Sequence, residues 1–170
     1  TPAYKPQSDN SLFGDQRAMR KPPEGTVAVN HLVTDDHLHR GKVGGAFAAT
    51  LPKSIAVDET TMALGKAQFG IYCAPCHGLG GEGDGMVHQR AESLKQGWVP
   101  PSNLHQQYIR DQAAGELFNT ITNGIRNMPG YAAQTDVEER WAIVLYVRAL
   151  QKSRVGSPSD LTEAERAQLK

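Results

Sequence analysis

The most continuous apolar pattern in the chain lies near its C-terminal end, over residues 141–147, where every side chain is apolar. A helix that is apolar nearly all round must be buried on more than one side. Asp136 and Glu139 precede this run with the spacing of a capping box, which marks a helix start. We therefore predict a central buried helix over residues 137–150.

A second helix is predicted to begin near Asp58, whose side chain can cap free backbone N–H groups, and to end near Tyr72. Met62 and Phe69 belong to its apolar pattern. Gly65 lies inside it, although a glycine in a helix costs about 1 kcal/mol relative to alanine. We therefore expect Gly65 to permit the close approach of another helix.

A third, shorter helix is predicted over residues 115–124. Its apolar face consists of Leu117, Phe118 and Ile121. Gly124 is typical of the residue that ends a helix. Pro129 and Gly130 prevent a helix from continuing beyond this point, so Met128 is expected on an ordered loop.

The first 57 residues show no long helical period and are rich in proline and glycine. We expect an irregular, extended arm, with a short strand where Val27 and Val29 alternate with smaller residues. The arm should pack on the core, because it has too many large apolar side chains for a disordered linker. These side chains are Val27, Val29, Leu32 and Phe47.

The predicted organisation is an arm over residues 1–57, one helical domain over 58–152 and a short helical tail over 153–170. Thr162 and Glu165 have capping-box spacing at the start of the tail helix. A chain of 170 residues is long enough for one domain with a sizeable core. The predicted fold class is all-α.

Composition narrows the range of partners. The chain has 18 Lys and Arg residues and 18 Asp and Glu residues, so its net charge is zero and a nucleic-acid partner is not expected. No apolar run approaches the roughly 20 residues of a membrane-spanning helix. Contact with a membrane is therefore expected only by association, or through a lipid anchor that this sequence does not contain.

The strongest chemical motif is Cys73-Ala74-Pro75-Cys76-His77, which contains both cysteines of the chain. A C-x-x-C-H sequence is the attachment signature of a c-type haem. The two thiols add across the haem vinyl groups, and the adjacent histidine becomes an axial ligand of the iron. The sequence thus predicts one covalently attached haem c.

Three other interpretations of the two cysteines are weaker. A thioredoxin-type redox pair normally follows a strand in a βαβ unit, whereas the residues before Cys73 predict a helix. A structural zinc site needs a second ligand pair, and the chain has no second pair of cysteines. A disulfide across only two residues would be strained.

Other motifs favour structural roles. His31, His37 and His39 lie near Asp35 and Asp36, but their spacing is poor for a metal, so we favour a solvated polar loop. The glycine-rich stretch 78–85 lacks the Lys-Ser/Thr pair of a phosphate-binding loop, and we expect a tight turn. Pro100-Pro101 could present a backbone carbonyl to the second ring nitrogen of His77.

The second axial ligand has several candidates. They are Met19, Met62, Met86, Met128 and the histidines other than His77, of which His88 is closest to the motif. Met128 has enough preceding chain to reach the opposite face of a haem, and Pro129 and Gly130 restrict its loop. Met128 is therefore our choice, and Met86 and His88 remain as alternatives.

The order and spacing of these residues resemble class I c-type cytochromes over residues 58–152. The matching positions are Gly65, Phe69, Cys73, Cys76, His77, Pro101, Met128-Pro129 and the helix from Trp141 to Tyr146. The resemblance implies an all-α fold around one haem. It also implies Cys73 and Cys76 as the thioether residues and His77 and Met128 as the axial pair.

A narrower resemblance is to the monohaem cytochrome c subunit of bacterial alternative complex III, a quinol-oxidising complex. It rests on Pro22–Ala28, the Cys-Ala-Pro-Cys-His-Gly loop, Ile121–Gly124 and Glu139–Val144. It implies a periplasmic, membrane-associated electron carrier rather than an enzyme. Its donor would be a quinol-oxidising complex, and its acceptor cytochrome c oxidase or another cytochrome. The alternative is a haem protein with an open distal site that acts as a ligand sensor or an enzyme.

Overall fold

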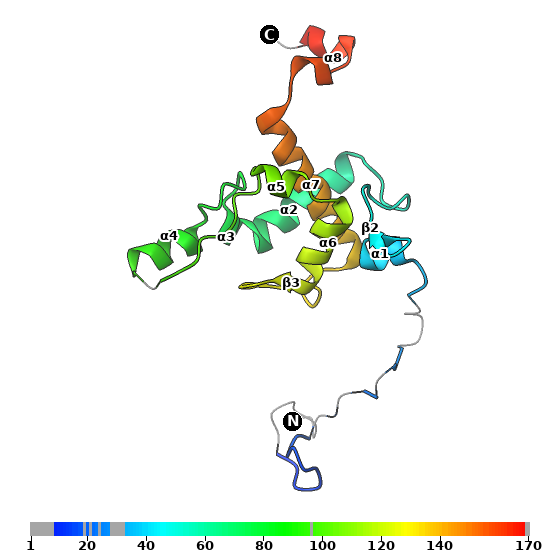
Figure 1. Cartoon of the computed structure of the whole chain (residues 1–170), viewed down its shortest axis with the longest axis vertical. Helices are drawn as coiled ribbons and strands as arrows, with labels where there is room; N and C mark the ends of the chain where they lie inside the picture. The colour runs from blue at the N-terminus through cyan, green and yellow to red at the C-terminus, as the bar shows by residue number, and fades with distance from the viewer. Residues whose placement is uncertain are drawn as a thin grey trace. The chain divides into compact units, whose positions relative to one another are not determined.

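The computed structural model describes residues 9–18, 20, 22–23, 25–27, 33–95 and 97–168. The chain divides into two compact units, residues 1–34 and 35–170. The second unit contains all the helices and hairpins that Figure 1 labels. The predictions for Met19, Val29, His31 and Leu32 lie outside the described residues.

The first unit has little regular structure in its described part. An isolated bridge pairs Asp9 with Arg17, and the Arg20 guanidinium lies over the Phe13 ring. Val27 belongs to no strand, and the other residues of the strand predicted there lie outside the described residues. The packing of residues 1–34 on the rest of the chain stays a prediction.

The two predicted core helices are present and begin where their caps place them. In α2 (Glu59–Tyr72), the Asp58 carboxylate accepts a hydrogen bond from the Thr61 N–H at 2.8 Å. In α7 (Val137–Val155), Asp136 and Glu139 form the predicted capping box. Helix α7 continues five residues beyond the predicted end.

The two helices cross at Gly65, as predicted. A Cβ atom on Gly65 would lie 2.0 Å from the Ala142 carbonyl oxygen, so only glycine lets the two backbones approach this closely. Beside the crossing, the rings of Phe69 and Tyr146 lie 5.3 Å apart. The crossing therefore fixes the end of α2, from which the cysteine motif continues.

The core is completed by α6 (Ala114–Asn123), the third predicted helix. Its Phe118 ring stacks on Trp141 of α7 with ring centroids 4.3 Å apart, and both side chains are fully buried. Trp141 also donates its indole N–H to the Leu38 carbonyl at 2.7 Å. This bond ties the N-terminal part of the second unit to its last long helix.

Residues 35–57 belong to the same compact unit as the core helices. They contain α1 (Asp36–Arg40) and the two-stranded hairpin of β1 (Lys42–Val43) and β2 (Ala46–Phe47), which the sequence pattern did not predict. Gly41 and Gly115 bring this segment against α6, because a Cβ on Gly41 would lie 2.6 Å from the Gly115 carbonyl oxygen. Ala48 and Ile55 are buried.

The remaining elements are short. They are α3 (Ala74–His77), α4 (Met86–Ser93), α5 (Gln107–Arg110), β3 (Gly124–Ile125), β4 (Met128–Pro129), the 3-10 helix η1 (Pro158–Asp160) and α8 (Glu163–Gln168). With only two-residue strands in its two hairpins, the unit confirms the predicted all-α class. Within the described ranges, no helix combines the length and the apolar character needed to cross a bilayer.

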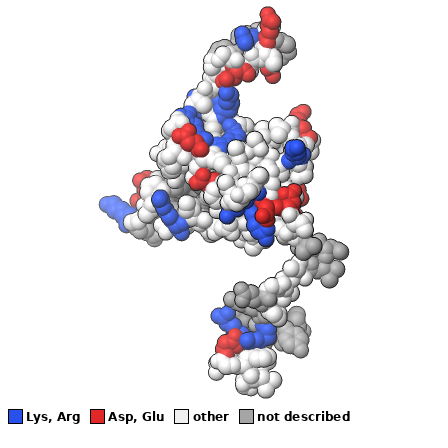
Figure 2. Space-filling view, turned by 45° about the vertical axis from the view of Figure 1, so that its right-hand side comes forward, with Lys and Arg blue, Asp and Glu red and all other residues white. Residues whose placement is uncertain are grey.

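Charges are dispersed over the surface. On the face that Figure 2 shows, basic and acidic side chains are interspersed and neither sign forms a continuous field. This distribution agrees with the zero net charge of the sequence.

Candidate functional site

The cysteine motif forms a single helical turn that continues directly from α2. Cys73 is both the residue that ends α2 and the cap residue at the start of α3. Its carbonyl accepts hydrogen bonds from the N–H groups of Cys76 at 3.1 Å and His77 at 2.8 Å. Side chains three residues apart on a helix lie on one face, so the turn presents the two thiols side by side.

The two cysteines are free thiols, and the surroundings of Cys73 do not activate it. Burial raises the pKa of the Cys73 thiol to about 12, and the neighbouring Cys76 contributes to the increase. Redox-active cysteine pairs have the opposite property, a lowered thiol pKa that makes the thiolate available at neutral pH. The pair also follows helix α2 rather than the strand of a βαβ unit, so the structure argues against a thioredoxin-type function.

The His77 ring is oriented by a backbone carbonyl. Its Nδ1 lies 3.0 Å from the Ser102 oxygen, and a carbonyl can only accept a hydrogen bond, so Nδ1 must carry the proton. The lone pair of Nε2 is then available to a metal. Burial lowers the pKa of His77, which favours the neutral imidazole that metal binding requires.

The sequence pattern placed this carbonyl at Pro100-Pro101, and that prediction is wrong by one residue. The two prolines fix the extended path of the segment, but the carbonyl that meets the histidine belongs to Ser102. His77 and Ser102 are 25 residues apart, and the chain between them must turn back to bring the Ser102 carbonyl to the histidine. Local sequence does not determine which carbonyl arrives there.

The glycine-rich stretch 78–85 folds tightly over the turn, as predicted. The Gly83 N–H donates to the His77 carbonyl at 2.7 Å. A Cβ on Gly85 would lie 2.5 Å from the Cys76 carbonyl oxygen, so the loop touches the turn where only glycine fits. Gly78 has a positive φ of 80°, which glycine adopts without strain.

Met128 lies in a hairpin rather than in the predicted loop. It pairs with Ile125 across β3 and β4, and its side chain is partly buried.

Tyr131 lies three residues after Met128, and its N–H donates to the Ile121 carbonyl at 2.8 Å. Burial raises the pKa of the Tyr131 hydroxyl, and Cys76 and Cys73 add to the effect, so this tyrosine lies near the cysteines. No pattern in the sequence predicted that Tyr131 would lie near the cysteines.

The other candidate ligands are placed differently. Met86 is 73% exposed on α4, and His88 on the same helix lies 3.7 Å from the Glu92 carboxylate. His37 contacts the Thr50 carbonyl through Nε2 at 2.9 Å and packs edge-on against Trp141. In the part of the chain that the structure describes, no three His, Cys, Asp or Glu side chains cluster as a metal site would require.

The cysteines and the histidine fit a covalently bound haem. Two free thiols lie on one face of a turn, and the adjacent histidine has one nitrogen committed to a carbonyl and the other available as a ligand. Such a carbonyl contact is the usual support for a histidine that binds a metal. The chemistry of the donor set therefore matches the attachment motif.

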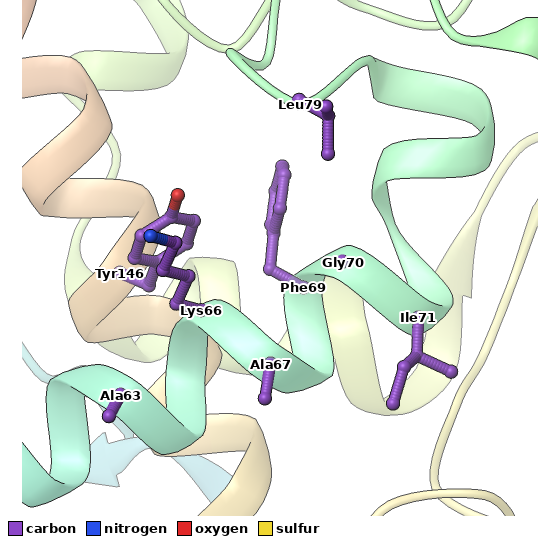
Figure 3. Close-up of a pocket in the computed structure, with 8 residues that line it drawn as sticks. All are labelled: Ala63, Lys66, Ala67, Phe69, Gly70, Ile71, Leu79 and Tyr146. Carbon is purple, nitrogen blue, oxygen red and sulfur yellow. The ribbon is translucent and has the colours of Figure 1, made fainter.

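An apolar groove lies along α2 (Figure 3). Phe69 and Tyr146 project into it, and Leu79 faces them from the glycine-rich loop. Its lining residues are Ala63, Lys66, Ala67, Phe69, Gly70, Ile71, Leu79 and Tyr146. The lining has no thiol, imidazole or thioether group.

The chain matches a known protein family over residues 60–147, more than half of its length. The family is described as "Cytochrome C oxidase, cbb3-type, subunit III". Together with the helical architecture, this match confirms the predicted class I cytochrome c fold.

Comparisons with individual proteins say less about this chain than the family match does. No curated protein sequence gives a significant match. A chain of the reducing HAO-like protein complex of Kuenenia stuttgartiensis is similar in structure, with a TM-score of 0.47 and 22% sequence identity. The similarity covers 68% of the present chain and 54% of that chain, so the present chain corresponds to about half of it.

Proposed function

We propose a function for this chain from the premise that it belongs to the c-type cytochrome family described as cytochrome c oxidase, cbb3-type, subunit III. A cytochrome c domain binds haem c covalently and serves haem-based electron transfer. Our proposal is a carrier of single electrons with one haem. Cys73 and Cys76 would provide the thioether bonds, and His77 and Met128 the axial ligands.

One observation carries this proposal. His77 donates Nδ1–H to the Ser102 carbonyl, and it does so directly beside two free thiols. An enzyme that used these thiols for redox chemistry would need a lowered thiol pKa, whereas burial raises the pKa of Cys73. These features support a turn that holds a prosthetic group over one that carries out thiol–disulfide exchange.

The haem, when bound, supplies an iron that alternates between ferric and ferrous states. His77 and Met128 would both hold the iron, and no position would then remain open for oxygen or peroxide. The thioether of Met128 favours the ferrous state, so the proposed pair would give a raised reduction potential. No acid, base or nucleophile is needed, and we assign none.

We further propose a respiratory role outside the cytoplasm, because thioether haem is attached on the far side of the energy-transducing membrane. The resemblance to the cytochrome subunit of alternative complex III supports a quinol-oxidising complex as electron donor. The family description names an oxidase subunit, which supports cytochrome c oxidase or another cytochrome as acceptor. Association with such partners would bring the protein to the membrane surface.

The test is to produce the protein with a cytochrome c maturation system and to examine its haem. Acid–organic extraction should leave the haem on the polypeptide, and the double variant Cys73→Ala/Cys76→Ala should yield no holoprotein. The ferric protein should show the weak near-infrared band of sulfur ligation, which Met128→Ala should abolish and Met86→Ala should preserve.

The opposite results would contradict the proposal in different ways. Extractable haem would exclude covalent attachment. A parent protein without the sulfur band, whose ferrous form binds carbon monoxide, would instead point to the open distal site of a sensor or an enzyme. If Met86→Ala loses the band and Met128→Ala keeps it, the axial ligand is Met86 of α4 and not Met128.

A further inference from the structure

A buried polar network connects the end of α7 to the segment behind His77. Gln151 is only 4% exposed, although glutamine is usually a surface residue. Its side-chain Nε2 donates to the Leu104 carbonyl at 2.8 Å, and its Oε1 accepts from the Arg148 guanidinium at 2.8 Å. Leu104 lies two residues beyond Ser102, whose carbonyl meets His77.

The orientation of the Gln151 amide is determined by its neighbours. A guanidinium can only donate hydrogen bonds, so the amide oxygen must face Arg148 and the NH₂ group must face Leu104. Arg148 is itself fixed, because it also donates to the carbonyls of Arg110, at 3.0 Å, and of Gln112. The amide therefore cannot turn over without leaving buried polar groups unpaired.

The same segment is anchored on its other side by the glycine-rich loop. The Leu104 N–H donates to the Gly81 carbonyl at 2.8 Å, and His105 Nε2 contacts the Gly80 carbonyl at 2.7 Å. That loop is bonded back to the His77 carbonyl through the Gly83 N–H. The Ser102 carbonyl thus lies in a segment that both α7 and the loop hold in place.

We propose that Gln151 is a positioning residue for the iron ligand. It fixes Leu104, and through Leu104 it fixes the Ser102 carbonyl at hydrogen-bonding distance from His77 Nδ1. This inference rests on the proposed function, in which His77 Nε2 binds the iron. A buried amide with both ends paired gives a single arrangement of the segment, which an apolar side chain of similar size would not impose.

The network has an electronic consequence. The bond from Nδ1–H to a carbonyl makes the imidazole a stronger donor to the metal. A stronger donor stabilises the ferric state, so loosening this bond should raise the reduction potential. It should also let the His77 Nδ1–H exchange with solvent more often.

The test uses two substitutions of Gln151 in the holoprotein. Gln151→Met keeps the volume and removes both hydrogen bonds, whereas Gln151→Glu keeps an oxygen for Arg148 and removes the donor to Leu104. The Arg148 cation should keep that glutamate ionised and unable to donate. Both variants should raise the reduction potential and speed the exchange of the His77 Nδ1–H, measured by NMR, by about tenfold, as expected from weakening one hydrogen bond.

A matched control is available between α2 and α7. Gln68 of α2 donates to the Glu139 carboxylate of α7 at 2.6 Å, far along α7 from Gln151. Gln68→Met removes a glutamine hydrogen bond between helices without touching the segment behind His77. It should leave both the potential and the exchange rate at the parent values.

The possible outcomes separate this inference from the proposed function. If Gln151→Met lowers the melting temperature but leaves potential and exchange unchanged, Gln151 has only a structural role and the inference is wrong. A parent-like Gln151→Glu would also overturn it, since the bond to Leu104 would then be irrelevant. If Gln151→Met does not fold, Gln151→Glu, which keeps the contact with Arg148, decides alone, and an unchanged potential in that variant overturns the inference. A parent whose haem is not bound through His77 would overturn the proposed function itself.

Discussion

The segment that contains His77 differs from the segment that contains Met128, the second axial ligand that we propose. His77 follows α2 and its cysteine turn without interruption, and a carbonyl 25 residues away fixes its ring. Met128 lies in a short hairpin whose tip residue, Arg126, has a positive φ of 52° and whose Ile125 is 51% exposed. The comparison indicates that the histidine is positioned by the packed core, whereas the methionine is positioned by local backbone geometry.

The largest expected effect comes from removing a large side chain at the centre of the buried core. Trp141→Ala should lower the free energy of unfolding by about 3–5 kcal/mol, because it leaves a cavity under Phe118 and removes the bond to Leu38. Denaturant unfolding of the holoprotein measures this. Trp98→Ala, at a residue that is 42% exposed, is the matched control and should cost about 0.5 kcal/mol or less. Equal costs at the two tryptophans would contradict the comparison.

The helix crossing should be the next most sensitive point. In Gly65→Ala the new Cβ would lie 2.0 Å from the Ala142 carbonyl oxygen. Because this distance is too short, the backbones of α2 and α7 must move apart. We expect a cost of about 1–3 kcal/mol from this overpacking, measured as a lower melting temperature. An unchanged melting temperature would show that α2 and α7 do not cross here.

Met128→Ala should have a smaller effect on stability and a large effect on the spectrum. Its side chain is only partly buried, so we expect about 1–2 kcal/mol, below the roughly 2–5 kcal/mol of a fully buried methionine. The ferric sulfur band should disappear, and the ferrous protein should bind carbon monoxide. A cost as large as that of Trp141→Ala would mean that the hairpin is as firmly packed as the core.

The smallest effect is expected in the opposite direction. Gly70 lies on the same helix as Gly65, but a Cβ placed there has no atom within 4 Å. Gly70→Ala should therefore stabilise the protein by up to about 1 kcal/mol through helix propensity alone. A rise in the melting temperature here, with a fall in Gly65→Ala, would separate the steric role of Gly65 from the general effect of glycine in a helix.

The features that the sequence predicted well are those that local chemistry determines. Asp58 and Asp136 begin their helices because a cap acts within one turn of its own residue. The helix crossing at Gly65 was predictable, because glycine destabilises a helix and its presence there indicated a close contact with another backbone. The spacing of Cys73 and Cys76 indicated the chemistry of the turn, because both thiols and the histidine lie within five consecutive residues.

The features that were missed depend on contacts between distant residues. The choice of Ser102 over Pro101 as the partner of His77 is set by the path of a long excursion, not by the prolines themselves. Helix α1 has an Asp35 cap and a Gly41 end, but it is too short to show an apolar period. The burial of Gln151 could not be predicted, because a polar residue near the end of a helix usually faces solvent.

The bond between Trp141 and Leu38 bears on the order in which the chain can fold. The two residues are 103 positions apart, so their contact forms only after most of the chain has been made. Contacts at such separation slow folding, because the entropy of closing the loop is lost before the contact is gained. Helix α2 likewise needs α7, its main packing partner, to cover its inner face. Helix α2, which leads directly into the cysteine turn, is therefore synthesised well before the helix that covers its inner face, and the turn gains its packed support only when the C-terminal part of the chain has been made.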